Sequence, residues 1–227
     1  GITTSNGSQT TPRLTTDGNG GVYIVWEDCR NGDCSKSDIY AQHVNWSGAI
    51  THDANGALIC DAAYKQFLPM VRNDGSGGAL IVWGDQRTGG SYGMYLQRLT
   101  SSGTTLTENG KESFFGIATD DASEAYNHGA IYLENDEALV YWQDNRWGES
   151  KIYGSKISPS FDHTSEYFSN EDINGQQLTS LEGGQLTPKA ILAGDKIFLS
   201  FMVEEEPQSN LYFQLLNMDL SPLGSAT

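Results

Sequence analysis

The fold is decided by a stretch of sequence that occurs three times. Its first copy reads Val22-Tyr23-Ile24-Val25-Trp26-Glu27-Asp28-Cys29-Arg30, its second Ala79-Leu80-Ile81-Val82-Trp83-Gly84-Asp85-Gln86-Arg87, and its third Ala138-Leu139-Val140-Tyr141-Trp142-Gln143-Asp144-Asn145-Arg146. Each copy is an apolar run that ends in Trp-x-Asp-x-Arg. Short runs that are rich in β-branched and aromatic residues predict strands and not helices.

The repeat continues through the rest of the chain. A degenerate fourth copy, Ile197-Phe198-Leu199-Ser200-Phe201, is followed by Glu204-Glu205-Glu206 in place of the Asp-x-Arg signature. The aromatic anchors of the four copies are 57, 59 and 59 residues apart, at Trp26, Trp83, Trp142 and Phe201. A second motif follows each anchor and keeps one tyrosine in register, at Tyr40, Tyr95, Tyr153 and Tyr212. A fixed period of this length indicates a repeat architecture.

Each repeat reads as four strands separated by turns rich in Gly, Asn and Ser. In the first repeat they are Arg13–Thr16, Val22–Trp26, Ile39–Val44 and Ala57–Cys60. Four antiparallel strands at this period predict one blade of a β-propeller. We expect an all-β, four-bladed propeller as a single domain over residues 1–227, with blades at about 12–61, 69–118, 128–179 and 188–227 plus 1–4. A four-blade segment of a larger propeller is the alternative.

The last repeat ends before a fourth strand is evident. Within the N-terminal segment Ile2–Thr4, the pair Ile2-Thr3 is in register with Ile59-Cys60 of the fourth strand of the first repeat. An unpaired strand edge exposes backbone donors and acceptors. We therefore expect the N-terminal strand to pair beside the Tyr212 strand and close the propeller.

The repeats resemble those of large secreted surface proteins from Bacteroidetes-type bacteria. The resemblance rests on Gly-Gly-(apolar)-Val-Trp-x-Asp-x-Arg, on Asp-Ile-Tyr-Ala-Gln, and on Ile-Cys-x-Ala-Ala-x-x-Gln-x-x-Pro, and is strongest over residues 9–98. The arrangement is also similar to that of four-bladed propellers of the hemopexin type. The resemblance implies a propeller with an extracellular or cell-surface location, joined to other domains of a larger surface protein. It implies no activity and no catalytic residues.

The net charge of the chain limits the classes of partner that it can bind. The formal net charge is −16, with 13 Lys and Arg against 29 Asp and Glu. Such a surface repels nucleic acids and anionic membranes. No apolar run approaches the roughly 20 residues of a transmembrane helix. We expect no nucleic-acid partner and no membrane insertion.

Two of the three cysteines bracket a tight turn. Cys29 and Cys34 flank Arg30-Asn31-Gly32-Asp33, a spacing that can bring two thiols within bonding range. We expect them to form a disulfide, which indicates an oxidising compartment, and two free thiols are the alternative. Cys60 follows an apolar run and is expected to be an inert core residue.

The repeated Trp-x-Asp-x-Arg residues are expected to stabilise the blades, because the same set recurs in three of them: Trp26, Asp28, Arg30, Trp83, Asp85, Arg87, Trp142, Asp144 and Arg146. Catalysis needs an asymmetric set of groups, and the four histidines lack metal-ligand spacing. We therefore expect no enzyme activity, no cofactor and no metal. A glycosidase-type pair of distant carboxylates is the alternative.

Function is expected where the repeats differ, on the face that carries the connections between the second and third strands and between blades. Carboxylates next to aromatic rings suit sugar stacking or a basic protein partner, and a solvated acidic rim is the plainer interpretation. The leading hypothesis is a non-catalytic extracellular binding or display module. A structural subunit of a secreted surface complex and a glycan-active propeller enzyme are the alternatives. The candidate ligand-binding residues are Asp120, Asp121, Tyr126, Trp147, Glu204, Glu205, Tyr64 and Tyr92.

Overall fold

The computed structural model describes most of the chain. The described residues are 1–87, 89, 92–105, 107–108, 111–112, 115–118, 126–133, 137–157 and 175–227, with only the backbone described at 107–108, 111–112, 115–118 and 126. Two compact units divide the chain, residues 1–116 and residues 117–227. Each unit is treated by itself below.

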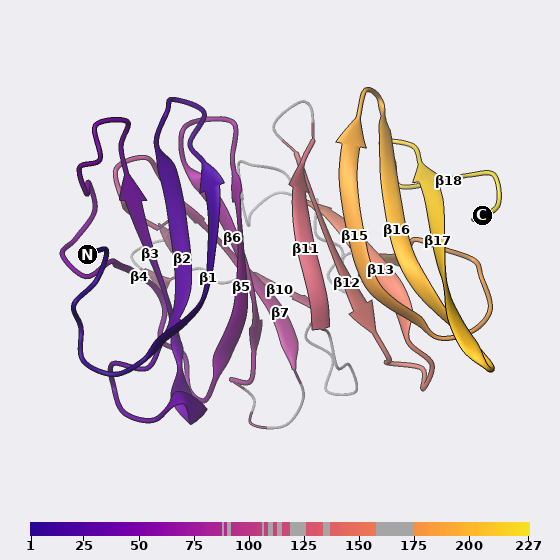
Figure 1. Cartoon of the computed structure of the whole chain (residues 1–227), viewed down its shortest axis with the longest axis horizontal. Coiled ribbons are helices and arrows are strands. Elements are labelled where there is room, and N and C mark those ends of the chain that lie inside the picture. The colour runs from indigo at the N-terminus through magenta and orange to yellow at the C-terminus, as the bar shows by residue number, and fades with distance from the viewer. Residues whose placement is uncertain are drawn as a thin grey trace. The chain divides into compact units, whose positions relative to one another are not determined.

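Two antiparallel sheets arise from the first half of the chain (Figure 1). We call the first sheet blade 1; it has the order β1 (Gln9–Thr16), β2 (Val22–Asp28), β3 (Asp38–Val44) and β4 (Ala57–Cys60). Blade 2 has the order β10 (Phe115–Ala118), β7 (Gly93–Leu99), β6 (Ala79–Asp85) and β5 (Gln66–Asn73). The remaining elements are a short 3₁₀ helix, η1 (Cys34–Lys36), and the ribbon of β8 (Thr107–Glu108) and β9 (Lys111–Glu112).

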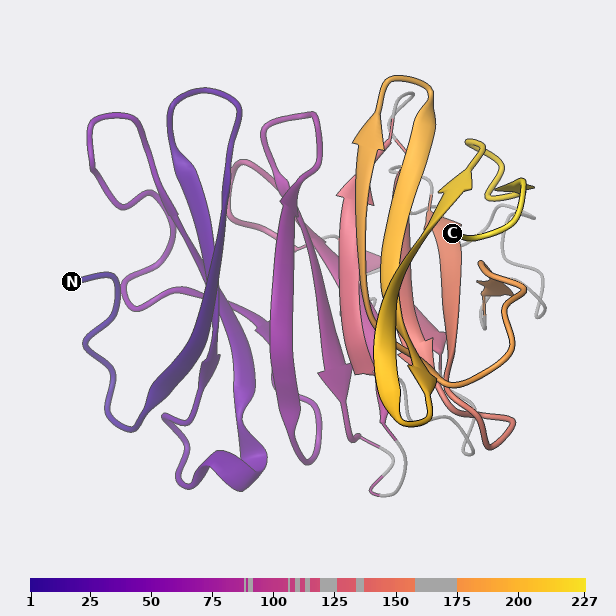
Figure 2. The same cartoon turned by 45° about the vertical axis from the view of Figure 1, so that its right-hand side comes forward.

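Two more four-stranded antiparallel sheets follow in the second half. Blade 3 has the order β11 (Tyr126–Tyr132), β12 (Ala138–Asp144), β13 (Lys151–Ile157) and β14 (Gln176–Gln177). Blade 4 has the order β15 (Gln185–Ala193), β16 (Lys196–Glu205), β17 (Gln208–Leu216) and β18 (Pro222–Leu223). The long β16–β17 hairpin of blade 4 is clearest in Figure 2. Four antiparallel four-stranded sheets confirm the predicted all-β propeller class.

The two repeated motifs meet in each blade, because the anchor strand pairs with the tyrosine strand. Trp26 lies opposite Tyr40, and Phe201 lies opposite Tyr212. In all four blades the two rings stack, with centroids 6.3 to 6.5 Å apart. The degenerate fourth copy therefore keeps the aromatic pair although it has lost the Asp-x-Arg signature.

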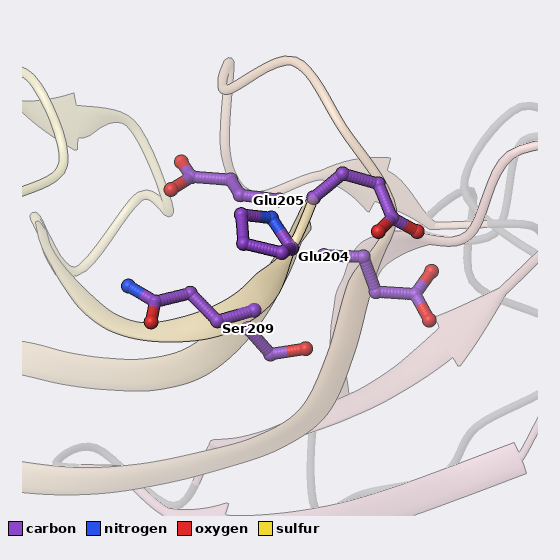
Figure 3. A pocket seen from close by; sticks show the side chains of 6 residues that line it. Glu204, Glu205 and Ser209 are labelled. Atoms are coloured by element: carbon purple, nitrogen blue, oxygen red, sulfur yellow. The ribbon is translucent and has the colours of Figure 1, made fainter.

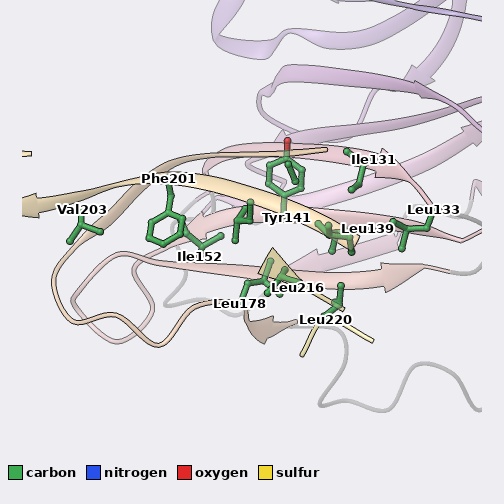
Figure 4. Packing of buried hydrophobic residues seen from close by; sticks show 13 residues of the cluster. Ile131, Leu133, Leu139, Tyr141, Ile152, Leu178, Phe201, Val203, Leu216 and Leu220 are labelled. Carbon is green, nitrogen blue, oxygen red and sulfur yellow. The ribbon is translucent and has the colours of Figure 1, made fainter. Parts of the chain in front are cut away.

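Hydrophobic packing joins successive blades within each unit. In the first unit β5 packs on blade 1, and the cluster includes Tyr23 and Ile39 from blade 1 and Val71 from β5. In the second unit β15 packs on blade 3 in a cluster that includes Leu139 and Ile152 (Figure 4). The first strand of one blade thus covers a face of the blade before it.

A bulge interrupts the first strand of every blade at the same place. The residue at each bulge has a positive φ of 48° to 51°. These residues are Thr11, Leu68, Asn127 and Thr187. The pairing with the second strand shifts at each of these residues. Three of the four precede a proline or lie in a Gln-x-x-Pro segment, and the fourth lies in the divergent third copy. The motif therefore marks a bend and not only a strand start.

In each unit, one side chain accepts hydrogen bonds from the bulges of two consecutive blades. The Glu27 carboxylate accepts from Thr11 Oγ1 at 2.7 Å in its own blade and from the Leu68 backbone N–H at 2.9 Å in the next. In the second unit the Gln143 side-chain oxygen accepts from Asn127 Nδ2 at 2.9 Å and from the Thr187 N–H at 3.1 Å. Glu27 and Gln143 occupy the same repeat position, directly after the tryptophan.

The expected role of the N-terminal strand is wrong. The fourth strand of blade 4 is β18, which follows β17 in the chain and pairs with Leu215 and Leu216. Thr227 extends this edge through two backbone hydrogen bonds with Phe213, at 2.9 and 3.1 Å. The N-terminal residues bind within blade 1 instead, where the Thr4 N–H donates to Asn55 Oδ1 at 2.7 Å. A turn of a few residues returns β18 to β17 with far less chain ordering than a distant terminus requires.

Candidate active site

The Trp-x-Asp-x-Arg residues form the same closed cluster in blades 1, 2 and 3. Each tryptophan Nε1–H donates to the aspartate carboxylate, at 2.7, 2.9 and 3.0 Å. Each arginine pairs with that carboxylate. Its guanidinium also lies over the tyrosine ring of the next strand, 3.5, 3.7 and 4.3 Å from the centroid.

The charged groups of these clusters are already paired, so they are poor candidates for catalysis. Burial works to raise the pKa of Asp28, but the hydrogen bonds from Arg30 and Trp26 outweigh it and hold that pKa below its ordinary value. The equivalent Asp85 and Asp144 are also buried and hydrogen-bonded. An ionised carboxylate whose oxygens already accept from a tryptophan and an arginine can neither donate a proton nor reach a substrate.

Blade 1 breaks the symmetry next to its cluster. Asp38 begins β3, directly opposite Asp28, and the matching residues are Gly93 in blade 2 and Lys151 in blade 3. Burial, and then the negative charges of Asp61 and Asp28, raises the pKa of Asp38, although Asn31 Nδ2 donates to it at 2.8 Å. A carboxyl group whose pKa lies above its ordinary value is a candidate proton donor.

The Asp38 group lies beside the loop that the cysteines bracket. Cys29 and Cys34 form a disulfide with Cα atoms 5.0 Å apart, and Asn31 belongs to the enclosed turn. Cys60 is buried and unbonded, and burial raises the pKa of its thiol to about 12. Asp38 and Asp61 were not among the residues expected from the sequence. The signal was available, because Asp-Ile-Tyr in the first copy differs in charge from Gly-Met-Tyr and Lys-Ile-Tyr in the next two.

A pocket of about 420 Å³ lies at the tip of the β16–β17 hairpin (Figure 3). Its lining is polar and consists of Glu204, Glu205, Glu206, Pro207, Gln208 and Ser209. Three glutamates are therefore among the residues that line this depression, at the place where the fourth repeat has lost the Asp-x-Arg signature. The expected residues Glu204 and Glu205 both belong to it.

The two adjacent glutamates point in opposite directions, because successive side chains of a strand alternate between its faces. The Glu204 carboxylate lies over Gly184, where a Cβ atom would come within 2.5 Å of Glu204 Oε2. The backbone N–H of Glu204 also donates to the Gly184 carbonyl at 2.9 Å. Glu204 thus leans toward the segment that enters β15.

Glu205 is bound on the other face of the hairpin. Its carboxylate accepts from Tyr212 Oη at 2.8 Å and from Asn210 Nδ2. The hydrogen bond to Glu205 raises the pKa of the Tyr212 phenol. Glu205 is therefore fixed by β17, whereas no hydrogen bond from another side chain to the Glu204 carboxylate is seen within the described part of the chain.

The other candidate residues are dispersed. In blade 2, Tyr64 is exposed near Gly89, and the Tyr92 ring meets Phe67 edge-on with centroids 5.2 Å apart. In the β12–β13 connection of blade 3, Trp147 is 83% exposed. Asp120, Asp121 and the Tyr126 side chain lie outside the described residues. The glutamates belong to one unit and Tyr64 and Tyr92 to the other, so each group is considered by itself.

In the described ranges, no group of three or more His, Cys, Asp or Glu side chains is arranged to hold a metal ion. Within the same ranges, no helix has the length and apolar character needed to cross a membrane.

No protein-family model matches the chain, and neither does any curated protein. Solved structures do match. A putative glycoside hydrolase from Parabacteroides distasonis is 14% identical with a TM-score of 0.56, and the match covers 98% of this chain and 73% of that one. An endo-arabinase from Bacteroides thetaiotaomicron is 10% identical with a TM-score of 0.53, covering 99% and 84%. An α-L-arabinanase from Cellvibrio cellulosa, complexed with arabinohexaose, is 14% identical with a TM-score of 0.52, covering 96% and 77%.

At identities this low, the matches show a shared fold alone. They nevertheless contradict the expectation that the chain is no enzyme and serves as a non-catalytic binding or display module, because the proteins whose fold it shares are glycoside hydrolases. The expectation rested on the repeated residues, which stabilise the blades, and a repeated scaffold does not by itself reveal its function. In its fold the chain is similar to the β-propeller glycoside hydrolases.

Proposed function

We propose that this chain is a glycan-active propeller enzyme that hydrolyses glycosidic bonds, with arabinose-containing polysaccharides as the first substrate class to test. The observation that carries the proposal is the carboxylate-lined pocket at the end of blade 4, on a fold shared with arabinanases. Glycosidases need two carboxyl groups, one that protonates the leaving oxygen and one that acts as base or nucleophile.

Glu204 and Glu206 are the pair we assign to the reaction. Both line the pocket, and Glu204 has no competing hydrogen bond of the kind that holds Glu205. Each can therefore take or give a proton at a bound sugar without first breaking an internal contact. Asp38 is a second candidate acid, supported by its raised pKa.

Sugar contacts are proposed for exposed aromatic rings and for the divergent loop. Trp147 and Tyr64 offer rings on which a sugar can stack. Asp120, Asp121 and Tyr126 keep the role expected from the sequence. We further propose an extracellular or cell-surface location in a bacterium, supported by the Cys29–Cys34 disulfide and by the resemblance of the repeats to secreted surface proteins.

The test is hydrolysis of arabinan, arabinoxylan and an aryl α-L-arabinofuranoside, followed as reducing ends or released phenol. Loss of an acid or base lowers such a rate by about 10²- to 10⁴-fold. We expect Glu204→Gln and Glu206→Gln to fall in this range. Glu205→Gln is the matched control, since it removes the neighbouring charge from the opposite face and should change the rate by only a few-fold.

Several results would count against the proposal. Absence of turnover by the wild type on all three substrates contradicts it directly. Turnover that survives in Glu204→Gln and Glu206→Gln but disappears in Asp38→Asn would move the site to blade 1. Equal losses in all the variants, accompanied by a lower melting temperature, would indicate damage to the fold.

A further inference from the structure

The carboxylate of Glu204 lies directly against a glycine. A Cβ atom at Gly184 would come 2.5 Å from Glu204 Oε2 and 3.5 Å from its Cδ, and the three nearest atoms all belong to the Glu204 side chain. The neighbouring Glu205 is held differently, by a hydrogen bond from Tyr212 Oη. The place of the Glu204 carboxylate therefore depends on the absence of a side chain at position 184.

The backbone does not explain why this residue is glycine. Gly184 is not among the residues with a positive φ, so its conformation is not one that only glycine adopts easily. The preceding Gly183 differs, because its φ of 86° is in the left-handed region that favours glycine. The two adjacent glycines therefore serve different purposes: Gly183 shapes the turn that enters β15, and Gly184 leaves room for a carboxylate.

Comparison of the repeats shows that this arrangement belongs to blade 4. Near the end of the second strand, a backbone N–H donates at 2.9 Å to a carbonyl of the segment that enters the first strand, from Cys29 to Ser8, from Gln86 to Lys65 and from Glu204 to Gly184. The backbone contact is thus common to blades 1, 2 and 4. Among these three blades, only blade 4 sets a glutamate against a glycine across the contact.

A lysine of blade 3 fixes the segment that carries Gly184. Lys151 Nζ donates to the carbonyls of Leu181 and Gly183 at 3.0 Å each, and its side chain is only 16% exposed. On the other side of Gly184, the Gln185 N–H donates at 2.8 Å to a carbonyl just before β13. Because the segment is attached on both sides, a methyl group at position 184 should move the flexible glutamate side chain more readily than the backbone.

We propose that Gly184 is a positioning residue for the glycosidase reaction, because the space above it keeps the Glu204 carboxylate where it exchanges a proton with the bound sugar. This inference rests on the function proposed above. An acid or base must lie within hydrogen-bond reach of the atom that it serves, and a misplacement of about 1 Å can cost about 10²-fold in rate. A side chain at position 184 should therefore slow the reaction without touching the substrate.

Gly184→Ala tests the proposal through the reaction. We expect kcat to fall by about 10- to 100-fold while KM changes by no more than about twofold, because the methyl group displaces a reacting group and not a sugar contact. Ser180→Ala is the control, since Ser180 is exposed in the same connecting segment and lies away from the carboxylate, and this variant should keep the rate of the wild type.

A second measurement needs no activity. In ¹³C NMR spectra of the glutamate carboxyl carbons, assigned with Glu204→Gln and Glu205→Gln, the Glu204 resonance should move in Gly184→Ala. The Glu205 resonance should stay in place, because Tyr212 holds that carboxylate on the other face of the hairpin. Ser180→Ala should leave both resonances unchanged.

The two measurements separate this proposal from the proposed function. An unmoved Glu204 resonance in Gly184→Ala overturns the contact, whatever happens to the rate. A moved resonance with an unchanged kcat overturns the positioning role. A Gly184→Ala protein that fails to fold also overturns the proposal, because the methyl group then meets something other than a movable side chain. A wild type without turnover overturns the proposed function and with it the role in the reaction, while the resonance still decides whether Gly184 places the carboxylate.

Discussion

Asp85 illustrates at the scale of the residue why the repeated motif is structural. It accepts from Trp83 Nε1 at 2.9 Å and pairs with Arg87, whose guanidinium lies over Tyr95. One side chain thus satisfies the indole, the turn backbone and a half-buried cation. The cost of losing such a carboxylate is dominated by the partners that it leaves unpaired.

We expect Asp85→Asn to lower the free energy of unfolding by about 3–5 kcal/mol, because it leaves the Arg87 charge without its counter-ion in a buried setting. Urea denaturation with an unchanged slope measures this. Asp195→Asn is the control, since Asp195 forms a solvent-exposed pair with Lys196 and should matter little. Equal effects of the two substitutions would contradict the distinction.

His52 makes the stability of the first unit depend on pH. Its ring lies against Tyr23 and under Gly103, and neither ring nitrogen has a hydrogen-bond partner in the described structure. Burial, and then the nearby His43, lowers the pKa of His52 from 6.5. The folded state therefore favours the neutral ring, while the unfolded chain takes up a proton at higher pH.

The free energy of unfolding should accordingly fall as the pH drops below about 6.5, the unfolded value, and level off above it. His52→Phe keeps a ring against Tyr23 but cannot be protonated, so the difference in stability between the two proteins should change between pH 7 and pH 5.5. Denaturation curves at matched pH values provide the measurement. A difference that stays constant with pH would refute the role of His52.

Among the structural elements, the first strand of each blade governs how blades join. Its bulge receives a hydrogen-bond acceptor from a side chain of the neighbouring strand or of the preceding blade. The Leu68 N–H points out of the ladder at the bulge and finds its acceptor on Glu27 of the preceding blade. In blade 3 the acceptor is an amide oxygen, because the Gln143 side chain accepts from the Thr187 N–H. The repeat therefore requires an acceptor at this position and does not require a charge.

We expect Glu27→Ala to cost about 1–3 kcal/mol of unfolding free energy, because it leaves the Leu68 N–H and the Thr11 hydroxyl without an acceptor. Glu27→Gln copies the residue that blade 3 uses and should cost much less. Chemical denaturation of both variants measures the ratio. If glutamine were as damaging as alanine, the carboxylate charge itself would be needed, and the parallel with Gln143 would fail.

In the whole molecule, the blades that keep the repeated residues differ in their consequences from the blade that has lost them. Three closed Trp-Asp-Arg clusters stabilise blades 1 to 3 and leave no group free for chemistry. Blade 4 has lost the cluster and gained a pocket lined with glutamates at the same strand end. The divergent copy therefore carries the proposed reaction.

Local pattern predicted the four repeats, the all-β class and most of the strands within each repeat. The sequence placed each aromatic anchor and the tyrosine that follows it in successive strands of one blade, and in the structure Trp26 lies opposite Tyr40. The short turn between Cys29 and Cys34 likewise indicated their disulfide. These features depend on side-chain alternation and turn chemistry, which a sequence displays directly.

Tertiary structure alone decided which strand completes blade 4, which carboxylates meet and which apolar faces stay open. The sequence suggested Ile2–Thr4 as the last strand, and β18 took that place because it is nearer in the chain. Adjacent Glu204 and Glu205 looked like one site, yet the pleat of β16 sends them to opposite faces. Whether Val71, Leu139 or Ile152 is buried depends on which sheet lies beside it. Such contacts join residues far apart in sequence, and no local pattern encodes them.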